Sequence, residues 1–270
     1  MKKYHLFLFL FALAIGFVSC SSDDDSSESA EGNARVRIEL TDAPGDYAHV
    51  YVEVEDVMIK TSTEGTDEEG WESLEGVRTG EYDLLTLTGG MTELLVDTEI
   101  PAGYLHQIRL VLGDKNSVVL NGTEQPLLLK IPSGQESGLK LQVNQELEAD
   151  AEYTFIMDFD VDKSIVTTGA GGFNLKPVIR VSVEENSGAI VGSVHPTTEQ
   201  VLITVENANT SASAYTNAEG NFMVHGLSAG TYKVTATPAA GVGLNPVVVN
   251  NVKVEQGSSV NLDPLYLDGE

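Results

Sequence analysis

The chain has 270 residues and a formal net charge of −26, which arises from 41 acidic and 15 basic side chains. A field of that sign repels the phosphates of nucleic acids and of anionic lipid headgroups, so both are excluded as partners. Calcium, cationic surfaces and neutral glycans remain compatible with it. Because Cys20 is the only cysteine, a disulfide within the chain is also excluded.

The first 19 residues are typical of an export signal. Two lysines precede an uncharged apolar run from Leu6 to Val18. At about 1.5 Å per residue, this run is too short to cross about 30 Å of hydrocarbon comfortably. The pattern therefore predicts a signal peptide over residues 1–19 rather than a membrane-spanning helix.

The residues around Cys20 predict a lipid anchor. Small residues before a lone cysteine, as in Val18-Ser19-Cys20, resemble the lipobox at which bacterial lipoproteins are cleaved and acylated, although Phe17 stands where an aliphatic residue is usual. The acyl chains would hold the protein on the membrane, because each buried methylene contributes about 0.8 kcal/mol. The alternative is a free thiol beside an ordinary cleavage site.

Residues 20–33 are expected to form a disordered acidic tether. They contain no aliphatic side chain larger than that of alanine, so they cannot bury enough apolar surface to become ordered. The cluster Asp23-Asp24-Asp25 resembles the surface-export signal of Bacteroidota lipoproteins, which implies an outer-membrane protein facing the cell exterior. The alternative is an ordinary solvated linker on a protein retained at the inner leaflet.

From residue 33 onward, alternating hydrophobicity predicts β-strands. Val36, Ile38 and Leu40 alternate with charged residues, and the same period recurs in Val50–Glu55 and in Tyr153–Val161. Such alternation indicates strands with one buried and one wet face. Gly- and Pro-containing turns separate these segments, and only Gly80–Leu87 and Met91–Val96 hint at a short helix. The fold class is therefore all-β, of the sandwich or barrel type.

The strand pattern predicts two β-sandwich-type domains. A polar break at Glu185-Asn186-Ser187-Gly188 separates a closing strand from a new series of strands. We place the first domain at residues 34–185 and the second at residues 189–270. Both segments are long enough to form a core of their own.

The first domain resembles the DUF4382 family of bacterial lipoprotein domains over residues 35–183. Several short motifs occur in the order that the family shows: Leu40-Thr41-Asp42-Ala43-Pro44, Tyr82-Asp83-Leu84-Leu85, Ile100-Pro101-Ala102-Gly103-Tyr104, Gln107–Leu112, Gly138–Leu141, Asp158-Phe159-Asp160, Ser164-Ile165-Val166 and Lys176–Val181. The family has no established activity. The resemblance thus implies a location on the cell surface, but no mechanism.

The second domain resembles the carboxypeptidase regulatory-like, transthyretin-type β-sandwich. The residues that carry this resemblance are Thr216–Phe222 and Gly226–Val234. Asn217 to Gly220 are expected to turn the chain, after which Phe222 and Val224 enter the core. The resemblance implies a carbohydrate-binding-like fold class, which by itself is only an association with sugar binding.

The motifs of common enzymes do not occur in the sequence. Gly134–Gly138 has the wrong spacing for a nucleophile elbow, and the four histidines after the signal peptide are scattered. Gly169–Gly172 lacks the βαβ setting of a dinucleotide loop. Chance pairs of carboxylates are expected among 41 acids, so they do not indicate a glycosidase. We predict that the protein is not an enzyme and needs no cofactor.

One acidic cluster is a candidate calcium site. Asp158, Asp160 and Asp162 would fall on one face of a strand, where three carboxylates repel one another unless water or a cation screens them. Calcium takes six to eight oxygen ligands, and a loop such as that of Asp42 could complete the set. The alternative is a solvated outer face.

Aromatic side chains are the candidate ligand-binding residues. Trp71 is the only tryptophan and follows an acidic segment; it could stack on a sugar, and the alternative is a core or hairpin anchor. Tyr51 and Tyr215 are the other candidates. We expect a surface binding or adhesion module with a glycan as the leading ligand. The alternatives are a structural subunit of a surface assembly, with an exposed strand edge, and a hydrolase with a deep cleft.

Overall fold

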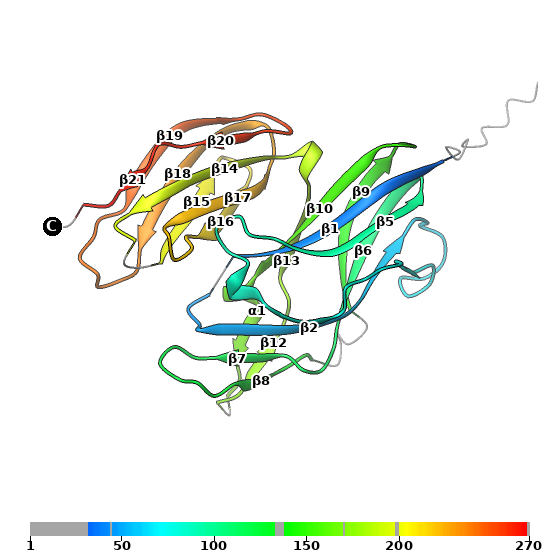
Figure 1. The fold of residues 1–270 in the computed structure, drawn as a ribbon, viewed down its shortest axis with the longest axis horizontal. Coiled ribbons are helices and arrows are strands. Elements are labelled where there is room, and N and C mark those ends of the chain that lie inside the picture. The colour runs from blue at the N-terminus through cyan, green and yellow to red at the C-terminus, as the bar shows by residue number, and fades with distance from the viewer. Residues whose placement is uncertain (1–31, 44, 133–137, 170, 198–199, 269–270) are drawn as a thin grey trace, which may run out of the picture.

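The computed structural model describes residues 32–43, 45–132, 138–169, 171–197 and 200–268, and it confirms the all-β, sandwich-type fold (Figure 1). The signal peptide, Cys20 and nearly all of the tether lie outside the described residues. Within the described ranges, no helix has the length and apolar character needed to cross a membrane.

Two sheets form the N-terminal sandwich. The first sheet has the order β13-β10-β1-β5. Its strands are β1 (Asn33–Ala43), β5 (Glu93–Pro101), β10 (Glu152–Asp160) and β13 (Ile179–Val183). The second sheet has the order β11-β12-β8-β7-β2-β6-β9, and β3 and β4 also pair with β2. Its strands are β2 (His49–Lys60), β3 (Glu72–Ser73), β4 (Gly80–Asp83), β6 (Gly103–Leu112), β7 (Ser117–Val119), β8 (Leu127–Lys130), β9 (Leu139–Leu147), β11 (Ile165–Thr167) and β12 (Phe173–Leu175).

Alternation along the central strands builds the core of this sandwich. Val36, Ile38 and Leu40 of β1 are fully buried, and β1 runs parallel to β10 with Ile38 opposite Phe155. β2 contributes a second buried row from the facing sheet. Burying each such aliphatic side chain contributes about 1.5–3 kcal/mol, so the two inner rows hold the sheets together.

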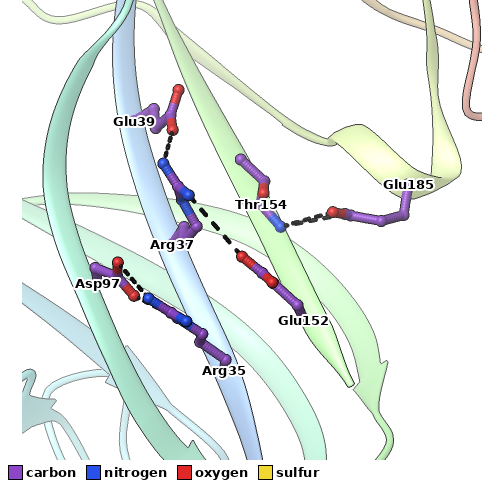
Figure 2. Close-up of polar contacts among 7 residues, drawn as sticks. All are labelled: Arg35, Arg37, Glu39, Asp97, Glu152, Thr154 and Glu185. Carbon is purple, nitrogen blue, oxygen red and sulfur yellow. Dashed lines mark hydrogen bonds and ion pairs between the residues drawn. The ribbon is translucent and has the colours of Figure 1, made fainter. Parts of the chain in front are cut away.

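The outer face of β1 is polar and paired with its neighbours (Figure 2). Arg35 Nε donates to Asp97 Oδ1 of β5 at 2.8 Å, and Arg37 Nη2 donates to Glu39 Oε1 at 3.0 Å. The Thr154 amide of β10 donates to the Glu185 carboxylate at 3.1 Å. Because Glu185 belongs to the 3-10 turn η3 (Glu184–Asn186), this bond fastens the connection between the two sandwiches to β10.

Two further sheets form the C-terminal sandwich. One has the order β17-β14-β20, with β21 pairing with β14, and the other has the order β16-β15-β18-β19. The strands are β14 (Gly188–His195), β15 (Val201–Glu206), β16 (Ser211–Tyr215), β17 (Asn221–Leu227), β18 (Gly230–Pro238), β19 (Val247–Val254), β20 (Ser259–Asn261) and β21 (Leu265–Tyr266). Phe222 and Tyr232 are the largest fully buried side chains of its core.

The turn before β17 forms as its sequence predicts. Asn217 Oδ1 accepts from the amides of Glu219 and Asn221, at 3.1 and 2.9 Å. Gly220 has a φ of +80°, and a Cβ there would approach the Val194 carbonyl oxygen to 2.5 Å. Only glycine meets both requirements.

The second sandwich covers part of the outer face of the first. β17 lies against β10 and β13, and β16 lies against β1. Ile156, which the alternation placed on the wet face of β10, is only 2% exposed as a result. Arg180 of β13 links the two sandwiches, since its Nη2 donates to the His225 carbonyl of β17 at 2.9 Å.

Of the two short-helix hints, the first is confirmed for a single 3-10 turn and the second is wrong. Gly80–Leu87 becomes strand β4 and the 3-10 turn η1 (Leu84–Thr86), which Asp83 caps by accepting from the Leu85 amide. Met91–Val96 is not helical, because β5 begins at Glu93 and pairs with β1. The lateral hydrogen bonds that β1 offers outweigh a weak local preference for helix.

Candidate functional site

An acidic loop lies across the outer face of the larger sheet. We call residues 61–71, between β2 and β3, the acidic strap; its acids are Glu64, Asp67, Glu68 and Glu69. Its anchor is Trp71, whose ring centroid lies 4.1 Å from the guanidinium carbon of Arg109. The indole Nε1 donates to the Asp67 carbonyl at 2.9 Å, which fixes the strap's conformation.

Two cations beneath the strap explain why it is held there. Lys60 and Arg109 are each only 6% exposed, and buried cations need partners. Glu68 accepts from Arg109 Nη2 at 3.0 Å and also from Lys140, while Lys60 Nζ donates to the Thr66 carbonyl at 2.9 Å. Trp71 is thus engaged with the protein's own Arg109, in the anchoring role that the sequence left as the alternative to sugar stacking.

Beside the strap is a polar hollow of about 180 Å³, which we call the strap hollow. Its floor comes from β6 and β9 and its wall from the strap; the lining residues are Lys60, Ser62, Thr63, Gly65, Asp67, His106, Gln107, Gln142 and Asn144. Gln107 and Gln142 stand opposite each other across the two strands. The hollow thus offers amides, hydroxyls and a carboxylate within one concave surface.

An aromatic pair adjoins the strap hollow. The rings of Tyr104 and His106 on β6 lie 4.6 Å apart at 51°. Tyr104 is 44% exposed, and its hydroxyl donates to the Asn144 carbonyl at 3.1 Å. A Tyr ring held in this way can pack against the C–H face of a sugar while its neighbours bond the hydroxyls.

A β-bulge shapes this region. The register of β6 and β9 shifts between Leu105 and Gln107, and Asn144 has a φ of +53°. A bulge bends its strand and redirects nearby side chains, which brings Asn144 and His106 to the same rim. Asparagine tolerates the left-handed conformation better than most residues do.

The sequence-predicted aromatics do not gather at one place. Tyr51 lies on β2, where its ring stacks on His49 with centroids 5.6 Å apart. Tyr215 lies on β16 of the other sandwich, and burial together with the carboxylates of Asp162 and Asp46 raises its pKa. The structure therefore brings Tyr215 near Asp162, but it leaves Tyr51 and Trp71 apart from both.

The expectation of three aspartates on one strand face is wrong. β10 ends at Asp160, whose side chain accepts from the Lys163 amide and caps the one-turn helix α1 (Val161–Ser164) that contains Asp162. Asp158 is paired with Arg180 at 2.7 Å and Asp160 with Lys163. Across the described residues, no three His, Cys, Asp or Glu side chains are arranged to hold a metal ion.

The carboxyl group of Asp42 is buried without a hydrogen-bond partner among the described residues. Asp42 is 4% exposed, and neither of its carboxyl oxygens has such a partner. Burial, the nearby Asp158 and, more weakly, Asp160 raise its pKa well above the ordinary value; the facing Val161 amide lowers the pKa slightly without making a full hydrogen bond. The carboxyl is therefore biased towards its neutral form.

Comparison with known proteins identifies the first sandwich. A family model described as "Domain of unknown function (DUF4382)" matches residues 33–177, which confirms that resemblance. No curated protein matches the chain.

Similarity to solved structures is remote. A type II cohesin–X-dockerin complex of Acetivibrio cellulolyticus shares 24% identity over 30% of this chain and 58% of its own, with a TM-score of 0.25. The minor pilin GBS52 of Streptococcus agalactiae shares 10% identity over 87% of this chain and 96% of its own, with a TM-score of 0.25. A family CBM26 module of Eubacterium rectale Amy13K, solved with maltoheptaose, shares 15% identity over 87% of this chain and 95% of its own, with a TM-score of 0.23. TM-scores of this size do not indicate a shared fold.

Proposed function

The chain belongs to the DUF4382 family, whose function is unknown, and from its own geometry we propose that it is a non-enzymatic binding module with a neutral glycan as ligand. We further propose that it is a lipoprotein, anchored through Cys20 in the outer membrane and facing the cell exterior. The tether then places both sandwiches where external polysaccharide is found. The C-terminal sandwich is proposed to be of the carboxypeptidase regulatory-like type.

The strap hollow is the observation that carries this proposal. An exposed aromatic, Tyr104, stands beside a hollow that presents the amides of Gln107, Gln142 and Asn144. Amides both donate and accept hydrogen bonds, as sugar hydroxyls do. The surrounding negative charge does not oppose a neutral ligand, whereas it would repel a polyanion.

The carboxyl content of the hollow supports binding without turnover. Among the described residues that line it, Asp67 is the only one with a carboxyl group. Most glycosidases flank the scissile bond with two carboxyl groups about 5–10 Å apart. A single carboxylate suits a hydrogen bond to a sugar hydroxyl better than it suits acid–base catalysis.

A glycan array probed with the purified chain, with and without calcium, tests the proposal. We expect binding to at least one neutral glycan, and about a tenfold loss with Tyr104→Ala, because the variant removes the aromatic ring on which the C–H face of a sugar would pack. Gln142→Ala should weaken binding severalfold. Product analysis of the bound glycan should show no cleavage.

Tyr266→Ala is the matched control. Tyr266 is also exposed and stacks on a histidine, His195, with ring centroids 5.5 Å apart. It belongs to β21 of the C-terminal sandwich, whereas the strap hollow belongs to the N-terminal sandwich. Binding that survives Tyr104→Ala but not Tyr266→Ala would move the site to the C-terminal sandwich. Hydrolysis of an arrayed glycan would contradict the non-enzymatic part of the proposal.

A structural subunit is the second candidate, and strand β19 favours it. β19 is the outer strand of its sheet, and Val248 on it is 49% exposed. Such an edge can pair with a strand of another chain. A stable protein partner in pull-downs, lost with Val248→Lys, together with an empty glycan array, would support this alternative.

A further inference from the structure

A second cavity lies where the two sandwiches meet. It measures about 280 Å³, and we call it the seam cleft. The N-terminal sandwich lines it with Asp158, Asp160, Lys163 and the segment 178–180, and β16 lines it with Ser211, Ala212 and Ser213. Neither sandwich alone would form it.

The ion pair in the seam cleft leaves bonding capacity unused. Arg180 Nη2 donates to Asp158 Oδ2 at 2.7 Å and to the His225 carbonyl at 2.9 Å. A guanidinium has five N–H donors, and the bonds of Arg180 to the described residues come from Nη2 alone. Asp158 Oδ1 likewise has no hydrogen bond to a described residue. A donor edge and an acceptor atom of opposite charge therefore remain side by side.

The rest of the lining repeats this balance of charge. Lys163 and Asp160 form a second pair, and the Lys163 side chain is 66% exposed. Ser211 and Ser213 alternate on β16 with the buried Ala212, so both seryl side chains face away from the C-terminal core. Val178 and Ile179 add an apolar surface.

We propose that the seam cleft binds a small zwitterion, an α-amino acid with an apolar side chain. Its carboxylate would accept from the unused N–H groups of Arg180 and from Ser213. Its ammonium group would donate to Asp158 Oδ1, and its side chain would pack on Val178. A free anion or cation satisfies only one half of this lining, whereas a zwitterion satisfies both without breaking the Asp158–Arg180 pair.

The site does not depend on the proposed glycan function. The strap hollow is built from β2, β6, β9 and the strap, and it shares no lining residue with the seam cleft. Tyr104→Ala should therefore leave amino-acid binding unchanged, and failure of one proposal leaves the other standing.

Isothermal titration calorimetry of the full chain tests the proposal with three probes. L-leucine carries both charges, N-acetyl-L-leucine only the negative one, and L-leucine amide only the positive one. We expect L-leucine to bind in the micromolar to millimolar range and each analogue to bind at least tenfold more weakly, since each analogue loses one charge-assisted hydrogen bond.

Two variants locate the binding. Asp158→Asn should weaken L-leucine binding at least tenfold, and Ser213→Ala should weaken it severalfold while leaving both ion pairs intact. Thermal melts check that each variant is folded. If L-leucine fails to bind at 10 mM to the folded chain, if the analogues bind equally well, or if Ser213→Ala and Asp158→Asn both bind as the parent chain does, the proposal is overturned.

Discussion

We expect the buried carboxyl of Asp42 to contribute to stability with a pH dependence opposite to that of an ion-paired acid such as Asp97. In the unfolded chain this group titrates near its ordinary value of 3.8, while in the folded chain burial and neighbouring carboxylates raise its pKa well above that. At this site the folded state therefore binds more protons between the two values, and the contribution of Asp42 to the free energy of unfolding falls as pH rises through that window.

The magnitude follows from linkage. Each pH unit inside the window lowers the free energy of unfolding by about 1.4 kcal/mol, and the contribution is fully present only below the unfolded pKa. Asp42→Asn keeps the shape of the side chain and removes the titration. The stability of the variant relative to the parent chain should thus grow by about 1.4 kcal/mol per pH unit above 4, until the folded pKa is reached.

Urea unfolding followed by circular dichroism, from pH 4 to pH 8, measures this difference. Asp97→Asn is the control, because Arg35 lowers the pKa of Asp97 by a side-chain hydrogen bond and by charge. Loss of that pair should remove stability that is present above the ordinary carboxyl pKa, which is the opposite sign. Parallel pH curves for Asp42→Asn and the parent chain would refute the assignment of a buried, unpartnered acid.

Three further predictions concern the lipid anchor, the division of the chain into two domains and the packing at the start of β14. Cys20→Ala should move the protein from membranes to the soluble fraction, and persistence in a salt-washed pellet would contradict the lipid anchor. Residues 189–270 expressed alone should show a cooperative thermal transition and a β-rich circular dichroism spectrum; an unfolded segment would contradict independent folding. Gly188→Ala should cost about 1–3 kcal/mol in urea unfolding, because its Cβ would approach Val254 Cγ1 to 2.4 Å. Gly169→Ala is its control, because no atom of the described residues lies within 4 Å of the new Cβ.

Period-two alternation was enough to predict the strands that line a core. Val50, Val52 and Val54 point inward because alternate side chains of a strand share a face, and all three are buried. The same rule could not say whether the other face meets water or protein. Ile156 belongs to the outer row of β10, and only the docking of the second sandwich buries it.

Local chemistry also overrode the pattern at the end of β10. Continued alternation would carry the strand through Asp162, but Asp160 accepts from the amide three residues later and starts a helical turn. Aspartate is a preferred N-cap residue, so the sequence of Asp160–Lys163 was also compatible with a helical turn capped by Asp160. The period of hydrophobic residues alone does not predict whether Asp160 caps a helical turn or the strand continues.

The strap hollow could not be assembled from the sequence. Tyr104 and Asn144 are 40 positions apart and meet only because β6 pairs with β9. The bulge at Asn144 then decides which side chains share the rim, and no sequence motif marks it. The available indication was local: Tyr104 and His106 alternate with the buried Leu105, which places two polar aromatics on one face of a strand.

Strand β6 shows how one segment can serve both the fold and a site. Ile108 and Leu110 face the core, whereas Gln107 lines the strap hollow and Arg109 lies under Trp71. Gln107 lines the hollow and not the core, so it can change without disturbing the core. Arg109 is not free in the same way, because its buried charge needs Glu68 and the strap above it. The strap, and with it one wall of the hollow, is therefore held by contacts within the protein itself.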